Sequence, residues 1–277
     1  MKILVPIDLN EAAIPSLKAA SLIGKKIENC EIMILHGTNA PFPMMDVANT
    51  FDRSIIDEYL AEAKKKYDNI VKDIPELNES KIEFNPDLAF ALEAILDNIK
   101  SFRPDLLIMG NPVKYKNKKP ILGNTITDVL HTVTQPILII PEEQENFDFR
   151  EAVFSYDFKQ VKDNQNMRVF NTLSKAFGFR VHVMYAGEDL EHPSEKEIKA
   201  GLVLENILKD SPHSYHFVPS AKFTPALEEY LEENKIDLVV NLHREKGFWQ
   251  NLLGKSKSHY LATHIRKPLL ILNQDKD

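Results

Sequence analysis

The chain alternates short apolar runs with longer segments whose apolar residues recur at helical spacing. Its first half contains five runs rich in Ile, Leu and Val: KILVPID, EIMILH, KIEF, DLLIMG and PILIIP. Continuous runs of this kind predict strands of a parallel sheet that is buried on both faces. The segments between most of the runs repeat apolar residues every three to four positions, which predicts amphipathic crossover helices near 14–23, 60–70, 88–99 and 126–133. The pattern predicts an α/β fold.

The series of strands then restarts. EAVFSYD, RVHVMYA, SYHFVP, IDLVVNL and KPLLILN follow one another with the order and pattern of the first five runs. The tripeptide ALE also recurs, at 91–93 and at 226–228, in the fourth segment of each series. An internal duplication explains this repetition, and it predicts two domains, 1–143 and 149–277. The join at 141–150, PEEQENFDFR, is short and polar, so the two domains should touch rather than swing freely.

Charge and composition narrow the classes of partner. The 277 residues carry a formal charge of -7 with a pI near 5.8, which argues against general binding to nucleic acid or to an anionic membrane. No apolar run approaches the ~18 residues of a membrane span, and the opening MKILVPIDLN lacks the pattern of a signal peptide. We therefore expect a cytosolic protein with no nucleic-acid and no membrane partner. Cys30, the single cysteine, excludes an intramolecular disulfide; its setting in NCEIMIL favours a buried strand residue over a reactive thiol.

The stretch IMGNPVKYKNKKPILGNT, residues 108–125, has chemistry that suits a nucleotide. In open parallel sheets, ligands bind beyond the carboxyl ends of the strands, and an apolar run ends at Gly110. Gly123 then opens a predicted helix, whose free N–H groups and positive dipole end suit a phosphate. Between the two glycines lie four lysines, Lys114, Lys116, Lys118 and Lys119. The same residues also allow a plain turn glycine followed by a solvated loop.

The chain resembles a tandem universal stress protein, with two UspA-like α/β domains joined head to tail. Nucleotide-binding members of that family carry G-x2-G-x9-G-(S/T) after strand four, where this chain has Gly110, Val113, Gly123 and Asn124. The resemblance implies two Rossmann-like or flavodoxin-like domains, each with a five-stranded, mainly parallel sheet of strand order 3-2-1-4-5. It also implies that the final strands, near 136–141 and 268–273, pair the two halves as a pseudo-dimer with ten continuous strands.

The resemblance further implies an adenine nucleotide, ATP or a relative, in the first domain. The family has an Asp at the end of strand one, where this chain has Pro6-Ile7-Asp8, and strand two ends with Gly37 where a valine often contacts adenine. Asp8 could orient a water or Mg²⁺, or hydrogen-bond the ribose or its own turn. The implied site comprises Pro6, Ile7, Asp8, Gly37, Met109, Gly110, Val113, Gly123, Asn124 and Thr125.

Two residues depart from the family motif. Val113 adds a Cβ where the backbone should lie close to phosphate, and Asn124 replaces the Ser or Thr that contacts it. The amide of Asn124 and the hydroxyl of Thr125 could still serve an altered anion site.

The second half departs further from the motif. Asp157 is retained, but Leu242 replaces the first glycine and Glu245 falls near the second, where its charge would repel phosphate. Gly254-Lys255-Ser256 opens the last helix, yet a P-loop would need a glycine at Trp249. A simple anion site at this helix start stays open.

Other chemistries have little support. A strand would turn His213 and His216 to opposite faces, which makes a designed metal site there poor, and no nucleophile has a neighbouring base. The apolar insert at 38–57 could be a lid over the nucleotide, although packing against the other half is favoured. We expect a protein that binds ATP and acts by regulation; the alternatives are a nucleotide-free scaffold and a slow ATPase. Two chains could also pair as a homodimer.

Overall fold

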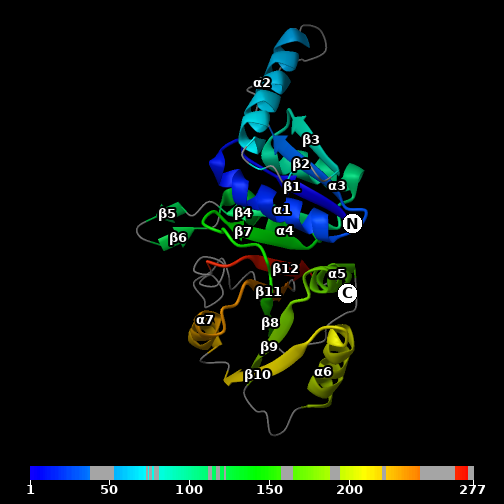
Figure 1. Ribbon diagram of the computed structural model, residues 1–277, viewed down its shortest axis with the longest axis vertical. Helices are drawn as coiled ribbons and strands as arrows, with labels where there is room; N and C mark the ends of the chain where they lie inside the picture. The colour runs from blue at the N-terminus through cyan, green and yellow to red at the C-terminus, as the bar shows by residue number, and fades with distance from the viewer. Residues whose placement is uncertain are drawn as a thin grey trace.

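A ten-stranded sheet with helices on both faces forms the molecule (Figure 1). The computed structural model describes residues 1–37, 53–72, 74, 77, 81–111, 114–116, 119–121, 123–156, 165–187, 194–219, 223–243 and 266–273.

The first half of the chain alternates strands and helices as the apolar pattern predicts. Its elements are β1 (Lys2–Pro6), the 3-10 turn η1 (Glu11–Ala13), α1 (Ile14–Lys26), β2 (Glu31–Gly37), α2 (Arg53–Val71), β3 (Lys81–Asp87), α3 (Ala91–Phe102), β4 (Leu106–Asn111), β5 (Lys114–Lys116), β6 (Lys119–Ile121), α4 (Asn124–Thr132) and β7 (Ile137–Pro141). The four predicted helices are confirmed as α1 to α4.

The second half repeats the series. Its elements are β8 (Glu151–Tyr156), α5 (Gln165–Phe177), β9 (Arg180–Gly187), α6 (Glu195–Leu208), β10 (His213–Pro219), α7 (Phe223–Glu233), β11 (Leu238–His243) and β12 (Leu269–Asn273).

The strand order is β10-β9-β8-β11-β12-β7-β4-β1-β2-β3. Neighbouring strands are parallel within each half, whereas β7 and β12 pair antiparallel, with Leu269 opposite Ile139 and Ile271 opposite Ile137. Both the order 3-2-1-4-5 in each half and the continuous ten-stranded sheet are thus confirmed. Figure 1 shows the sheet running the length of the molecule, from β3 at one end to β10 at the other.

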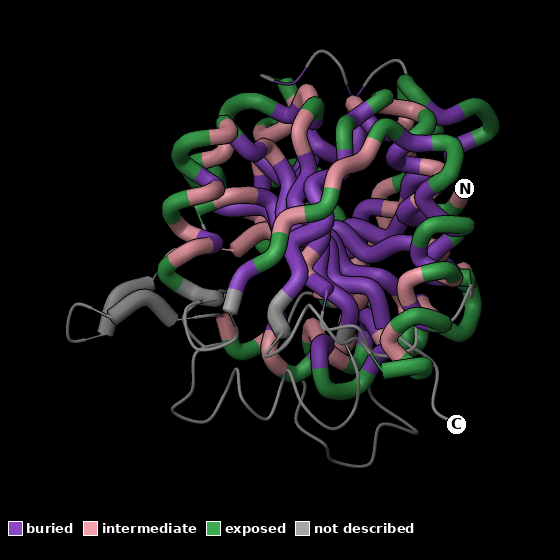
Figure 2. The backbone as a smooth tube through the Cα atoms, turned by 90° about the horizontal axis from the view of Figure 1, so that it is seen from below, coloured by how far each residue is buried: buried purple, intermediate pink, exposed green. Residues whose placement is uncertain are grey.

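The core lies on both faces of the sheet, because the strands are apolar on both sides. Side chains of α1, α2, α5 and α6 pack on one face, and those of α3, α4 and α7 pack on the other. Figure 2 shows the buried strands at the centre, with partly exposed helices on both sides. Cys30 is buried, and burial raises the pKa of its thiol, which disfavours the reactive thiolate.

The stretch of lysines after β4 differs from the predicted loop. β5 and β6 form an antiparallel hairpin, in which Lys114 pairs with Ile121 and Lys116 with Lys119, and the hairpin projects from the sheet in Figure 1.

The two halves can be aligned through their backbone pairing. Asp105 accepts a hydrogen bond from the N–H of Lys2 at 2.7 Å, and Asp237 accepts one from the N–H of Glu151 at 3.1 Å. Each aspartate lies two residues after a residue with left-handed backbone, which is Arg103 (φ 52°) in one half and Lys235 (φ 50°) in the other. These features align α3 with α7 so that the first residues of the two helices correspond.

This alignment corrects two details of the predicted repeat. The equivalent of Ala91 is Phe223, not Ala226. The two ALE tripeptides therefore do not occupy equivalent positions in the two halves. In the third strands, Ile82 pairs with Ile32 while His213 pairs with Val181, the equivalent of Ile32. The true alignment is therefore shifted by two residues, which leaves each side chain on its predicted face.

Candidate functional site

The predicted site residues of the first half gather at the edge of the sheet where β1, β2 and β4 end. Because β1 lies between β4 and β2 and all three run parallel, their carboxyl ends are neighbours. Pro6 ends β1, Gly37 ends β2, and Met109 and Gly110 lie near the end of β4. Gly123 precedes α4, which leads back to the start of β7. This edge is where open parallel sheets bind their ligands.

The turn after β1 is fixed by its backbone. The N–H of Ile7 donates to the carbonyl of Leu35 at 2.8 Å, and Nδ1 of His36 donates to the carbonyl of Ile7 at 2.9 Å. Ile7 is buried, whereas Asp8 is exposed. Asn10 then caps η1 by accepting from the N–H of Ala12 at 3.0 Å. The carboxylate of Asp8 is therefore presented to solvent at the edge.

Gly37 is required by packing within the fold. A Cβ at this position would lie 2.9 Å from the carbonyl oxygen of Ala89 and 2.9 Å from both N and Cα of Ala91. All three contacts are to backbone, which cannot rotate away as a side chain can. The start of α3 thus approaches the end of β2 as closely as a glycine allows.

Gly110 also has a packing reason, although a milder one. A Cβ there would lie 3.3 Å from the carbonyl oxygen of Ala12 and 3.6 Å from Oγ of Ser16. Ser16 is fully buried and donates to the carbonyl of Ala13 at 2.8 Å. The first motif glycine is therefore partly explained by the approach of η1 and α1 to β4.

Gly123 differs from both, because nothing in the described fold requires a glycine there. Its backbone, φ −59° and ψ 145°, is open to any residue, and a Cβ would meet only the tip of Ile126 at 3.9 Å. It is the N-cap of α4 and makes no side-chain cap hydrogen bond. Asn124 is exposed and Thr125 is half-buried at the first turn. A glycine with free space around it, before the first N–H groups of a helix, leaves room for a ligand.

Asn111 follows Gly110 at this edge and is not among the predicted site residues. Its Oδ1 is buried and has no hydrogen-bond partner in the described part of the chain. A buried acceptor without a donor is costly, so a donor from a ligand or water would stabilise this site. The residue type gave no signal of this, since burial of a single atom depends on the fold around it.

Several predicted residues lie outside the described residues. These are Val113 and Lys118, residues 38–52 of the insert, and in the second half Asp157, Glu245, Trp249 and Gly254-Lys255-Ser256. The side chains of Lys114, Lys116 and Lys119 also lie outside the description, although their strands are placed.

Leu242 is the equivalent of Gly110 in the second half. Gly110 pairs with Ile140 on the next strand, and Leu242 pairs with Leu272 in the same way. The Leu242 side chain is 8% exposed and belongs to the core. Space left by a glycine in the first half is thus filled by a leucine in the second.

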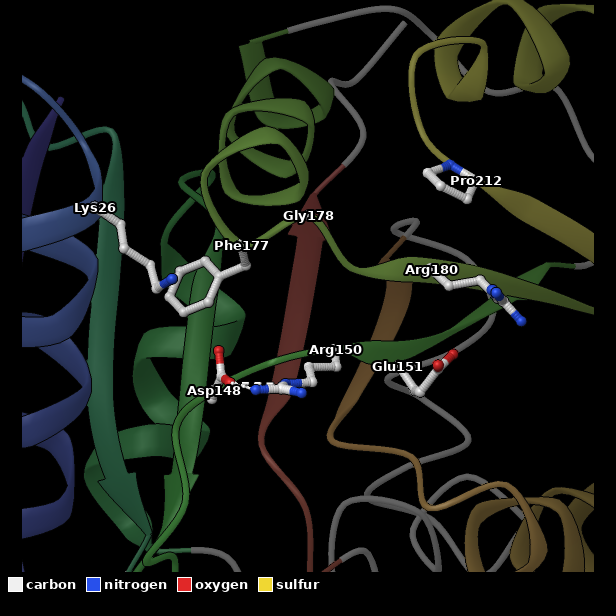
Figure 3. Close-up of a pocket in the computed structure, with 8 residues that line it drawn as sticks. All are labelled: Lys26, Asp148, Arg150, Glu151, Phe177, Gly178, Arg180 and Pro212. Carbon is white, nitrogen blue, oxygen red and sulfur yellow. Dashed lines mark hydrogen bonds and ion pairs between the residues drawn. The ribbon is translucent and has the colours of Figure 1, made fainter.

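A cavity of about 520 Å³ lies elsewhere, between the ends of α1 and α5 and the starts of β8 and β9 (Figure 3). None of the predicted site residues lines it. Lys26 lies over the ring of Phe177 at 4.9 Å, and Arg150 pairs with Asp148 at 2.7 Å. Since two helices end here, their negative dipole ends account for the nearby cations and disfavour an anionic ligand.

Comparison with protein families decides where the chain belongs. A sequence profile described as the universal stress protein family matches residues 1–141. The chain belongs to the universal stress protein family. No curated protein compared with the chain matches it.

Solved structures extend the likeness of fold to the whole chain. A universal stress protein from Archaeoglobus fulgidus is similar with a TM-score of 0.69 and 20% identity, over 99% of this chain and 98% of that one. A putative universal stress protein from Pseudomonas aeruginosa has a TM-score of 0.61 and 14% identity, over 98% and 92%. The cytoplasmic domain of a prokaryotic cation chloride cotransporter has a TM-score of 0.53 and 9% identity, over 98% and 94%.

Neither a membrane-spanning helix nor a cluster of metal ligands occurs among the described residues. None of their helices has the length and apolar character needed to cross a bilayer. Among the same residues, no three His, Cys, Asp or Glu side chains form a group that could hold a metal ion.

Proposed function

We propose that this universal stress family member is a cytosolic protein that binds ATP or a related adenine nucleotide at the carboxyl edge of its first half, and acts by regulation rather than turnover. The observation that carries the proposal is Gly123. Its conformation and its surroundings among the described residues permit any side chain, so the described fold does not account for a glycine. A phosphate lying against the start of α4 would account for it.

The residues of the edge fit a nucleotide. The N–H groups at the start of α4 would bind phosphate oxygens, with the amide of Asn124 and the hydroxyl of Thr125 as further donors. Oδ1 of Asn111 is a buried acceptor for a base or sugar donor. Asp8 is an exposed carboxylate that could hold Mg²⁺ together with the phosphates. The lysines of the β5–β6 hairpin would screen the phosphate charge.

We also propose that the chain consists of two domains, 1–143 and 149–277, that pair as a pseudo-dimer, and that only the first binds nucleotide. The buried side chain of Leu242 supports this asymmetry, because it fills the position of Gly110. One nucleotide should then bind per chain.

A nucleotide-free interaction protein of the same fold is the second candidate. Gly37 favours it, because the close approach of Ala89 and Ala91 explains this glycine without any adenine.

Calorimetry with ATP and the full chain tests the proposal. We expect saturation at one ATP per chain in the wild type, loss of binding in Gly123→Trp, and nearly unchanged binding in the matched control Gly254→Trp. A bulky indole at Gly123 would occupy the approach of the phosphate. At about millimolar ATP, calorimetry still detects weak binding. If the wild type binds no ATP under these conditions, the nucleotide-free interaction protein is the better hypothesis. Two equivalent sites per chain would refute the asymmetry.

A further inference from the structure

A row of hydrogen-bonded side chains crosses the outer three strands of the second half beneath α7. Nε2 of His182 lies 2.7 Å from the carboxylate of Glu151, and its Nδ1 lies 2.7 Å from the hydroxyl of Tyr230. The same hydroxyl lies 2.9 Å from Nε2 of His216, which is also 2.8 Å from Oγ of Ser214. We call Glu151, His182, Tyr230 and His216 the α7 clasp, because they connect this helix with β8, β9 and β10.

The first half ties the equivalent helix to its third strand mainly through amides, and the carboxylate of Asp87 in β3 also accepts from the Asn98 amide at 3.5 Å. At the position of Tyr230 it has Asn98, and at that of His216 it has Asn85, with 3.1 Å between the two amides. The equivalent of His182 is Met33, whose sulfur accepts from the Asn85 amide at 4.0 Å. The same contact is therefore built in both halves, but only the second builds it from two imidazoles and a carboxylate.

At neutral pH one arrangement of hydrogens satisfies every bond among the four members of the clasp, and Oγ of Ser214 shares the Nε2–H of His216 with Tyr230. The carboxylate of Glu151 only accepts, so Nε2–H of His182 donates to it and Nδ1 of His182 is left as an acceptor. The hydroxyl of Tyr230 donates to that Nδ1 and accepts from Nε2–H of His216. These tautomers are assigned from the bonding pattern. Nδ1 of His216 makes no hydrogen bond within the described residues, and His216 is half-buried, so this nitrogen is where a proton can enter.

The clasp can take up one proton and keep all its bonds. When a proton binds Nδ1 of His216, the proton on Nε2 passes to the oxygen of Tyr230, whose own proton passes to Nδ1 of His182. The direction of the bonds is reversed: the tyrosine hydroxyl now donates to His216 and accepts from His182. The added charge comes to rest on His182, beside the carboxylate of Glu151.

A second proton cannot be accommodated in the same way. Both histidines would then carry an N–H directed at the oxygen of Tyr230, and the hydroxyl hydrogen would lose its imidazole acceptor. Two imidazolium rings would also lie with their centroids 5.6 Å apart. The charged residues on the surrounding elements are Arg180, which is the register partner of Glu151, Asp237 before β11, and the α7 carboxylates Glu228, Glu229, Glu232 and Glu233. Within the described residues none of these hydrogen-bonds His216.

We propose that the α7 clasp is a pH-sensitive switch, which accepts a first proton without opening and releases α7 from the outer strands when it accepts a second. The hydroxyl of Tyr230 is bonded to both imidazoles and so couples the two rings in one hydrogen-bond network.

The titration of His216 agrees in sign. Burial, and then the charge of His182, lower the pKa of His216 below its ordinary value. Because its pKa is lower in the folded than in the unfolded state, this histidine binds its proton more readily when the chain is unfolded. The folded state therefore loses stability as the pH falls from the ordinary pKa through the lowered pKa. Burial, with the charge of Glu151, raises the pKa of Tyr230, so its hydroxyl keeps its proton throughout. Acid should therefore loosen α7, and neutral pH should hold it.

Hydrogen exchange of the full chain, measured by mass spectrometry and corrected for intrinsic rates, tests the switch. Between about pH 7.5 and about pH 5 we expect the amides of α7 to exchange about tenfold faster. α3, with its amide contact, should show no such change. In His216→Asn, which supplies the first-half residue, a single histidine remains and the α7 response should disappear. His213→Asn changes the histidine on the other face of β10 and should leave the response as in the wild type.

The switch would be overturned if the corrected hydrogen-exchange rate of α7 did not depend on pH in the wild type. It would also be overturned if His216→Asn kept the full pH dependence of that rate. Should His216→Asn fail to fold, NMR titration of the wild-type histidines decides. We expect the ring signals of His216 to shift in two separated steps, whereas one independent single step would refute the coupling. Tyr230→Phe, which removes the hydroxyl between the rings, should convert the coupled steps into independent ones.

Discussion

A serine substituted in turn at Gly37, Gly110 and Gly123 should separate glycines that the fold requires from one that it does not. The new Cβ would lie 2.9 Å from three backbone atoms at Gly37, 3.3 Å from one carbonyl oxygen at Gly110, and 3.9 Å from a side-chain tip at Gly123. Serine is chosen because it is also a good helix N-cap, so Gly123→Ser carries no capping penalty.

The expected cost follows from these distances. At Gly37 the backbone of Ala89 and Ala91 must shift, and overpacking of this kind destabilises by about 1–3 kcal/mol. At Gly110 one carbonyl must give way by a few tenths of an ångström, which we expect to cost less than about 1 kcal/mol. At Gly123 no atom has to move, so Gly123→Ser should stay within about 0.5 kcal/mol of the wild type.

Thermal unfolding of the three variants measures this order. With about 2–4 °C of Tm per kcal/mol for chains of this size, Gly37→Ser should melt several degrees below the wild type and Gly123→Ser close to it. A Gly37→Ser variant as stable as the wild type would show that α3 does not hold its close approach to β2. A strongly destabilised Gly123→Ser would give Gly123 a role in the fold and remove the main support for a ligand there.

Two further predictions concern stability and titration. Asn273 donates to the carbonyls of Val133 at 3.2 Å and Gln135 at 2.9 Å across the two halves, so Asn273→Leu should lower the free energy of unfolding by about 2–4 kcal/mol in urea denaturation; a change below about 0.5 kcal/mol would contradict it. Burial acts to lower the pKa of His213, but its bonds to the Ser211 carbonyl and the Glu205 carboxylate outweigh burial and raise the pKa. This stabilisation is present below the ordinary pKa and is lost as pH rises through the raised one, so NMR titration should find a lower pKa for His213 in Glu205→Gln.

The strands and helices could be predicted from the sequence because the sheet is buried on both faces. Each strand is then a continuous apolar run, and each crossover helix shows its own period. The hairpin of β5 and β6 gave no such signal, since three-residue strands rich in lysine contain no apolar run.

The sites were harder to predict, because sequence spacing does not show why a residue is present. Gly37 and Gly123 were both predicted site residues, yet the backbone of α3 explains the first and nothing in the described fold explains the second. The strand did turn His213 and His216 to opposite faces, toward Glu205 of α6 and Tyr230 of α7, as predicted. The clasp itself was missed, because its members are scattered along the chain and meet only through the order of β8, β9 and β10.

The antiparallel pairing of β7 with β12 has a consequence for how the halves meet. Their connection, which runs from the end of β7 at Pro141 to the start of β8 at Glu151, keeps each half at a high effective concentration next to the other, in the millimolar range for short linkers. The pairing is therefore independent of how much protein is present and survives dilution that would separate two unlinked chains. It also occupies the inner edge of both halves, so a neighbouring chain that extended this sheet could add only at β3 or β10.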